Sequence, residues 1–139
     1  MYGLKCWEQS IAVDAEIRLA VESSTPAAAR TRVLDALGAT GEAADDIGLL
    51  VSEIVTNVVR HTPALEVVLS AGRVDSHYRV ESWSMGPIFD IPTRTVDEVT
   101  AGGYGLFIVD RVAQRWGVEA DETGTRVWFE VPVGATAAA

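Results

Sequence analysis

At 139 residues the chain has the length of one ordinary domain, and its content of 48% hydrophobic and 22% charged residues is typical of a globular protein. The formal net charge of −9, without a local cluster of Lys or Arg, argues against binding to DNA or RNA. Cys6 is the only cysteine, which excludes an internal disulfide, and we find neither a signal-peptide core nor the roughly 20 apolar residues of a membrane span. We therefore expect a single cytoplasmic domain, 1–139, that does not contact a membrane.

The first two elements predicted along the chain are a strand and a helix. Apolar and polar residues alternate from Glu16 to Ser24, which predicts a strand with one buried face. Pro26 suits the first turn of a helix, and Gly38 ends the Ala-rich run that follows it. The apolar residues from Ala27 to Leu37 could pair with a second copy or a partner protein, or pack on the chain's own sheet. The sequence leaves this open.

The longest predicted helix runs from about Glu42 to Arg60 and ends before Pro63. Its apolar residues repeat at the spacing of a single helix face: Ile47, Leu50, Val51, Ile54 and Val58. Two alternating segments follow, Ala64–Arg73 and His77–Ser84, and they predict a hairpin.

The second half of the chain begins with a segment that lacks a regular period. Residues 85–102 contain two prolines and a Gly-Gly pair, which is typical of a long loop that serves as a lid. A helix is predicted from about Tyr104 to Trp116, followed by a hairpin of Val118–Glu122 and Arg126–Val133 and a frayed Ala-rich tail. Because several strands are joined by turns too short for parallel crossovers, the order favours an α+β fold: a two-layer sandwich of a mixed, mostly antiparallel sheet with helices on one face.

Three polar residues on the long helix are candidates for chemistry. Glu53, Asn57 and His61 are four residues apart and form a stripe beside the apolar face, at the rim of the core. A carboxylate there could act as a base, and an amide oxygen could hold a metal ion. An ordinary solvated face explains the same spacing, and a histidine in the last turn of a helix often only caps carbonyl groups.

Two glycine-containing segments are further candidates. Gly102–Leu106 lies at a predicted helix start, where glycines allow close approach of a phosphate and free N–H groups favour an anion. A flexible hinge would show the same pattern. Gly124 and Thr125 could contact a ligand or could simply form a hairpin turn.

Taken in order, these segments resemble one family. Their order is similar to that of the ATP-binding domain shared by gyrase, Hsp90, histidine kinases and MutL (the GHKL type, or Bergerat fold). The segments that carry the similarity are LLVSEIVTNVVRHT (49–62), the hairpin that follows it, GGYGLFIVDRVAQRWGV (102–118) and GTRVWFEV (124–131). The match is closest to the anti-sigma-factor serine/threonine kinases of actinobacteria. It covers about residues 17–133.

The resemblance implies ATP and Mg²⁺ as cofactors. Asn57 would hold Mg²⁺, Glu53 would orient or deprotonate the attacking hydroxyl, and Gly103 and Gly105 would let the backbone wrap the phosphates. The set that would contact the cofactor is Asn57, His61, Ser84, Gly86, Gly103, Gly105, Leu106 and Thr125.

The chain departs from the family where an Asp-x-Gly sequence usually contacts the adenine. The corresponding residues are Ser84, Met85 and Gly86, so the glycine is present and the acid is absent. Replacing a charge-assisted hydrogen bond by a neutral one costs on the order of 1 kcal/mol or more. Asp90 lies six positions later but lacks the local glycine spacing.

The resemblance supports two hypotheses about function. In the first, the chain is an ATP-dependent serine/threonine kinase that binds a sigma factor and phosphorylates an anti-anti-sigma protein of the STAS type, with a homodimer as one assembly. In the second, the chain has lost useful ATP affinity and acts by sequestering its partner. A histidine-kinase catalytic domain is disfavoured because the chain has no room for phosphoacceptor helices.

Overall fold

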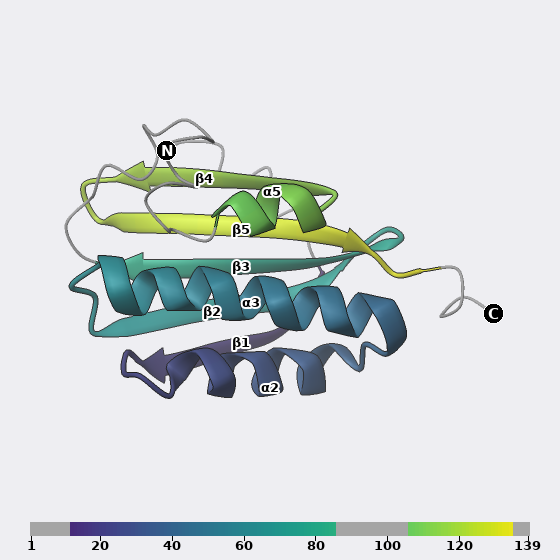
Figure 1. The fold of residues 1–139 in the computed structure, drawn as a ribbon, viewed down its shortest axis with the longest axis horizontal. Helices are drawn as coiled ribbons and strands as arrows, with labels where there is room; N and C mark the ends of the chain where they lie inside the picture. Colours follow the sequence, from purple (N-terminus) through teal and green to yellow (C-terminus); the bar gives the residue numbers. More distant parts are fainter. Residues whose placement is uncertain (1–11, 86–105, 135–139) are drawn as a thin grey trace.

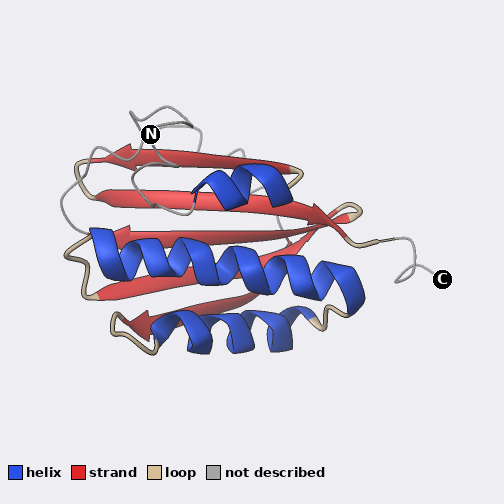
Figure 2. Cartoon of the chain, in the orientation of Figure 1, coloured by secondary structure: helices blue, strands red, loops and turns tan. Residues whose placement is uncertain are grey.

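The computed structural model describes residues 12–85 and 106–134. Within them five strands form one sheet in the order β1-β2-β3-β5-β4, and every neighbouring pair is antiparallel. The strands are β1 (Ala12–Ala20), β2 (Glu66–Val74), β3 (His77–Met85), β4 (Arg115–Asp121) and β5 (Gly124–Pro132). The helices are α2 (Thr25–Leu37), α3 (Gly41–His61) and α5 (Leu106–Val112). All three helices lie on one face of the sheet (Figures 1 and 2), so the predicted α+β fold class is confirmed.

The central helix, α3, forms because its apolar residues share one face, and most of them are fully buried. It ends at His61, since Thr62 is extended and Pro63 follows. The Thr62 hydroxyl donates to the Val58 carbonyl oxygen at 2.8 Å, and the Ala64 N–H donates to that hydroxyl at 3.2 Å. These bonds fix the last turn of α3, which carries part of the predicted polar stripe.

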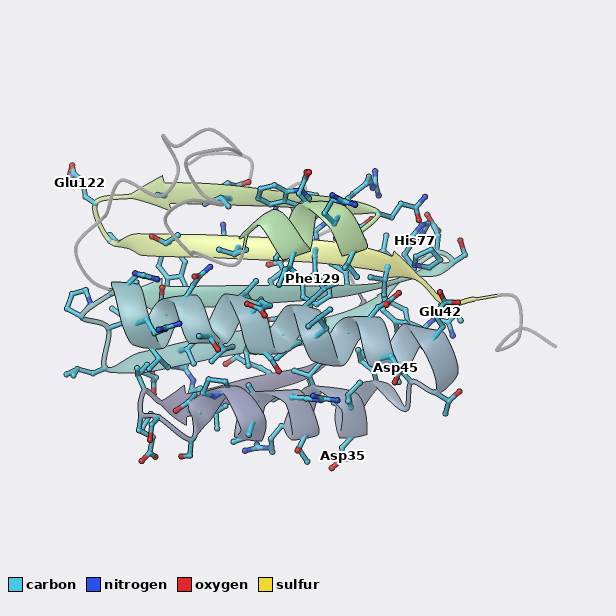
Figure 3. All side chains as sticks on the ribbon, in the orientation of Figure 1. Asp35, Glu42, Asp45, His77, Glu122 and Phe129 are labelled. Atoms are coloured by element: carbon cyan, nitrogen blue, oxygen red, sulfur yellow. The ribbon has the colours of Figure 1, made fainter. Side chains whose placement is uncertain are left out.

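The core lies between α3 and the sheet. Phe129 of β5, labelled in Figure 3, is completely buried there. The apolar side of α2 is also used internally, because Ala29 and Val33 are fully buried in the same core. Of the three options for this helix, the described structure therefore shows packing within the chain.

Strand β1 corrects a predicted boundary. The alternation predicted a strand over 16–24, whereas β1 spans Ala12–Ala20. Thr25 explains the early end: its hydroxyl donates to the Ala20 carbonyl oxygen at 2.6 Å and accepts the Glu22 N–H at 2.8 Å. These bonds turn the chain toward α2, so a local side-chain contact overrides the continuing apolar alternation.

Helix α5 is shorter than predicted, because Arg115 and Trp116 belong to β4 rather than to a helix ending at 116. The Gln114 N–H already donates to the carbonyl oxygen of Glu130 in β5 at 2.9 Å. Pairing with β5 therefore overrides the helical pattern. The predicted loop of residues 85–102 lies outside the described residues, apart from Met85, which ends β3.

Candidate nucleotide site

The polar stripe of α3 lies at the rim of the core, as its spacing predicts. Asn57 is 8% exposed, whereas Glu53 and His61 are half-buried. Neighbouring apolar residues hold this part of the helix down, since Val58 packs with Ala64 and with Val67 of β2. The stripe is therefore not an ordinary solvated face, because its middle residue is largely buried.

The side-chain amide of Asn57 is available for hydrogen bonding to a ligand. In the described part of the chain its side chain makes no hydrogen bond, although it is more than nine-tenths buried. Neither amide atom of Asn57 is among the buried side-chain atoms without a partner in the described residues, so the amide is open to solvent and can bind a ligand.

Ser84 and Thr125 form the second part of the site. They are directly paired across β3 and β5, and Ser84 also pairs with Val67 of β2. The side chains of Ser84, Thr125 and Val67 lie on the helix side of the sheet. Alternate residues of a strand share a face, and the buried residues Leu69 of β2 and Val80 of β3 mark the helix side. Since Val67 packs on Val58, the residue after Asn57, the structure brings this row to the same end of the core as the stripe.

Thr125 lies in a strand rather than in a hairpin turn. The β4–β5 turn is formed by Glu122 and Thr123, and Figure 3 shows Glu122 at its tip. Gly124, the first residue of β5, has a steric role, because a Cβ atom there would collide with the Ser84 carbonyl oxygen and approach Met85 Cα to 3.1 Å. Glycine thus allows β3 and β5 to approach closely beside Ser84.

Ser82 was not predicted as a site residue. It lies two residues before Ser84 on the same side of β3, is only 2% exposed, and its side chain makes no hydrogen bond among the described residues. The period of two in a strand was the signal that could have found it, because two buried serines at that spacing must share a face.

The predicted phosphate-binding glycines cannot be placed. Gly86, Gly103 and Gly105, like Asp90, lie outside the described residues. Leu106 is the first residue of α5, and its side chain is also outside the described set. Helix α5 itself contacts α3 and buries Val109 in the core.

The oxygen donors present fit a Mg²⁺·nucleotide. Mg²⁺ favours one or two protein oxygens completed by phosphates and water over a cage made only of protein ligands. The Asn57 amide oxygen could serve as such a ligand, and the described residues contain no cluster of three or more His, Cys, Asp or Glu side chains. No helix in the described ranges is both long enough and apolar enough to cross a membrane.

The comparisons agree with this fold. The family of histidine kinase-like ATPase domains matches residues 12–131, so the chain belongs to that family. No curated protein matches the sequence.

Two solved structures are similar to the chain. The RsbU and RsbW domains of Rv1364c from Mycobacterium tuberculosis superpose with a TM-score of 0.64 and 17% identity, over 85% of this chain and 32% of the other. The histidine kinase domain of the blue-light activated histidine kinase from Erythrobacter litoralis gives a TM-score of 0.49 and 27% identity, over 66% of this chain and 45% of the other. The chain therefore spans about one third of the length of the Mycobacterium protein and less than half of the other.

Proposed function

We propose that the chain is an ATP-binding regulator of the anti-sigma-factor type, which transfers the γ-phosphate of ATP to a serine or threonine of a cytoplasmic partner. The partners would be a sigma factor and an anti-anti-sigma protein of the STAS type. Membership in the histidine kinase-like ATPase family supports the ATP site, and the similarity to a structure that contains an RsbW domain supports the regulatory role. The position of Asn57, largely buried at the rim of the core and without a side-chain hydrogen bond to another described residue, is the observation that carries the proposal.

Each polar residue of α3 has a role in this proposal. The amide oxygen of Asn57 would hold Mg²⁺, which when bound offsets the charge of the ATP phosphates. Glu53, one turn earlier and half-buried, would orient the acceptor hydroxyl and take its proton. His61, one turn later, closes the same stripe with a Nε2 atom that is shielded from solvent.

The sheet would supply the contacts to the adenine. Ser84 replaces the family's acid at a position that is 5% exposed, and its hydroxyl can both donate and accept a hydrogen bond. Thr125 faces it directly across the β3–β5 pair. Recognition of the adenine here would be neutral, and therefore weaker than with a carboxylate.

Phosphoryl transfer provides the test of the proposed role of Glu53. With a purified STAS-type acceptor and labelled ATP, the wild type should transfer label in a Mg²⁺-dependent reaction, and Glu53→Gln should abolish transfer but still bind Mg·ATP. Asp45→Asn is a matched control, because Asp45 is an exposed acid near the start of the same helix. If Glu53→Gln transferred label at the wild-type rate, Glu53 would not be the base.

A second candidate function rests on Ser84. If the loss of the acid has abolished useful nucleotide affinity, the domain would act by sequestering a partner alone. In that case the affinity for the partner would be the same with and without ATP and in Asn57→Ala. A complex that forms only with ATP would exclude this alternative.

A further inference from the structure

Two serines of β3 place hydroxyl groups on the helix side of the sheet, in the row that forms part of the candidate nucleotide site. Ser82 and Ser84 are 2% and 5% exposed, and the residue that precedes them on the same side is the buried Val80. Across the sheet, Ser82 pairs with Leu69 of β2 and with Val127 of β5. The deeper of the two hydroxyls is therefore set among apolar side chains rather than in a polar network.

Neither hydroxyl has a partner within the described part of the chain. The side chains of Ser82 and Ser84 form no hydrogen bond there, although buried hydroxyl groups in proteins usually have one. Neither oxygen is among the fully enclosed side-chain atoms without a partner in these residues, so the small exposed area of each serine includes its hydroxyl. Two largely buried hydroxyls that still reach accessible space are suited to bind a polar group of a ligand.

The carboxylates of β3 and β5 lie on the opposite side of the sheet, away from the helices (Figure 2). We call this side the outer face and define it by six alternating residues of the two strands: Arg79, Glu81, Trp83, Arg126, Trp128 and Glu130.

Both of these acids are held on the outer face by Arg79. Its Nε donates to a carboxylate oxygen of Glu81 at 2.8 Å, and its Nη1 donates to Glu130 at 2.7 Å. Glu81 lies between Ser82 and Val80 in the sequence and points away from both. The strands therefore offer hydroxyls, and not a carboxylate, to a ligand on the helix side.

We propose that Ser82 and Ser84 together contact the C6 group of a purine base and accept both ATP and GTP. The inference rests on the proposed function, in which Ser84 contacts the base. A hydroxyl both donates and accepts hydrogen bonds, and its hydrogen rotates to suit the partner. It can therefore accept a hydrogen bond from the amino group of adenine or donate one to the carbonyl oxygen of guanine.

The spacing of the two serines allows them to act on one base. Their Cα atoms are two residues apart on one strand, which corresponds to about 7 Å. A C6 group that binds the Ser84 hydroxyl directly can reach the deeper Ser82 hydroxyl directly or through one water molecule. Ser82 would then add a contact to whichever purine is bound.

A carboxylate at residue 84 would give the opposite behaviour. An ionised carboxylate only accepts hydrogen bonds, so it would bind the adenine amino group and repel the guanine carbonyl oxygen. Discrimination between two ligands usually needs such a repulsive element. The hydroxyl pair lacks it, so the identity of the C6 group should have little effect on affinity.

Calorimetric titration of the full chain with the Mg²⁺ complexes of ATP, GTP and CTP tests this inference. The dissociation constants for ATP and GTP should agree within about threefold, whereas CTP should bind at least about tenfold more weakly. The reason for the second expectation is that the single ring of cytosine carries its amino group less far from the ribose. CTP thus separates contacts to the base from contacts to the phosphates.

Variants of Ser82 test its part in the contact. Ser82→Ala should weaken the binding of ATP and of GTP by the same factor, about two- to tenfold, because one neutral hydrogen bond is lost in each complex. Ser82→Cys keeps the size of the side chain but forms only weak hydrogen bonds, so it should show the same direction of change. Ser70→Ala is the matched control and should change neither affinity, because Ser70 of β2 pairs with Glu81 on the outer face.

Three results would overturn this inference and leave the proposed function in place. They are binding of ATP at least about tenfold more tightly than GTP, binding of CTP as tightly as ATP, and unchanged affinities in both Ser82 variants. A chain that binds ATP and GTP alike but transfers no phosphate to its acceptor would support the inference and contradict the proposed kinase activity. Absence of saturable binding of all three nucleotides would overturn both.

Discussion

Ser84 and Thr125 lie directly opposite each other on β3 and β5, on the helix-facing side of the sheet. This pair joins two segments that are far apart in the sequence, and Ser84 is only 5% exposed. In the proposed function, Ser84 takes the place of the acid that contacts the adenine. The strength and selectivity of nucleotide binding should therefore depend on residue 84.

We predict that Ser84→Asp increases the affinity for Mg·ATP by about five- to tenfold, because a charge-assisted hydrogen bond to the adenine amino group replaces a neutral one. Ser84→Asn is the matched control, since it has nearly the same shape as Asp without the charge. Calorimetric titration with ATP and with GTP should show that the gain is specific for adenine. An equal gain for both nucleotides, or for Ser84→Asn, would place residue 84 outside the adenine contact.

For Asn57 we predict a small effect on folding and a large one on binding. Asn57→Leu should leave the free energy of unfolding within about 1 kcal/mol of the wild-type value, because the Asn57 amide makes no hydrogen bond with a described residue that the substitution would remove. The same variant should lose Mg²⁺-dependent ATP binding. Urea unfolding of the apo protein measures the first effect. A loss of stability in both Asn57→Leu and Asn57→Ala would mean that the amide has a structural role instead.

The close approach at Gly124 couples the strand pair to the site. Gly124→Ala should destabilise the fold by about 1–3 kcal/mol and weaken ATP binding, because the new Cβ collides with the Ser84 carbonyl oxygen. Gly117→Ala is the control, since its Cβ would meet Trp128 Nε1 at 2.6 Å on the outer face, away from the site. Gly117→Ala should reduce stability without changing the ATP affinity of the folded protein. Equal losses of affinity in the two variants would argue against a local effect at Ser84.

The outer face should make stability depend on pH through Glu130. Burial alone would raise the pKa of Glu130, but hydrogen bonds from Arg115 and Arg79 outweigh it and hold the pKa below the ordinary value of 4.5. The stabilisation by Glu130 is therefore complete above pH 4.5 and lost as the pH falls through the lower folded-state value. For Glu81, burial outweighs the hydrogen bond from Arg79 and raises the pKa above its ordinary value of 4.5. The folded state therefore favours the neutral form of Glu81, and the stabilisation that this form gives is lost as the pH rises through the folded-state pKa.

Urea unfolding between about pH 3 and pH 7 separates the two carboxylates. Glu130→Gln should reduce the free energy of unfolding near neutral pH by about 3 kcal/mol, the usual order of magnitude for removing one partner of a buried ion pair. The same variant should lose less stability than the wild type as the pH falls. Glu81→Gln should keep that acid-side loss. A Glu130→Gln profile parallel to that of the wild type would show that Arg79 and Arg115 do not stabilise the charged form.

The parts of the fold that depend on long, regular patterns could be predicted from the sequence. Helix α3 has an apolar face sustained over about four turns, and the Asp75-Ser76 turn between β2 and β3 follows from the alternation on both sides, with Asp75 at a positive φ of 54°. The end of β1 and the start of β4 could not be predicted, because they depend on contacts between distant residues. Thr25 ends β1, and the pairing of Gln114 with Glu130 starts β4.

The candidate site was predictable along the helix and less so across the sheet. The i, i+4 stripe located Asn57, but only the strand register shows that Ser84 faces Thr125 and that Ser82 shares their side. The outer face was missed, although Arg79, Glu81 and Trp83 alternate visibly with apolar residues. A strand with charged residues on one side normally faces water, and nothing in the local sequence indicates that these charges are buried.

A calorimetric titration of the purified chain with ATP in the presence and absence of Mg²⁺ tests the central claim most directly. The account predicts saturable one-to-one binding that requires Mg²⁺ and is lost in Asn57→Ala, while the variant remains folded. Absence of saturable binding at millimolar ATP, or binding of equal strength in Asn57→Ala, would contradict it.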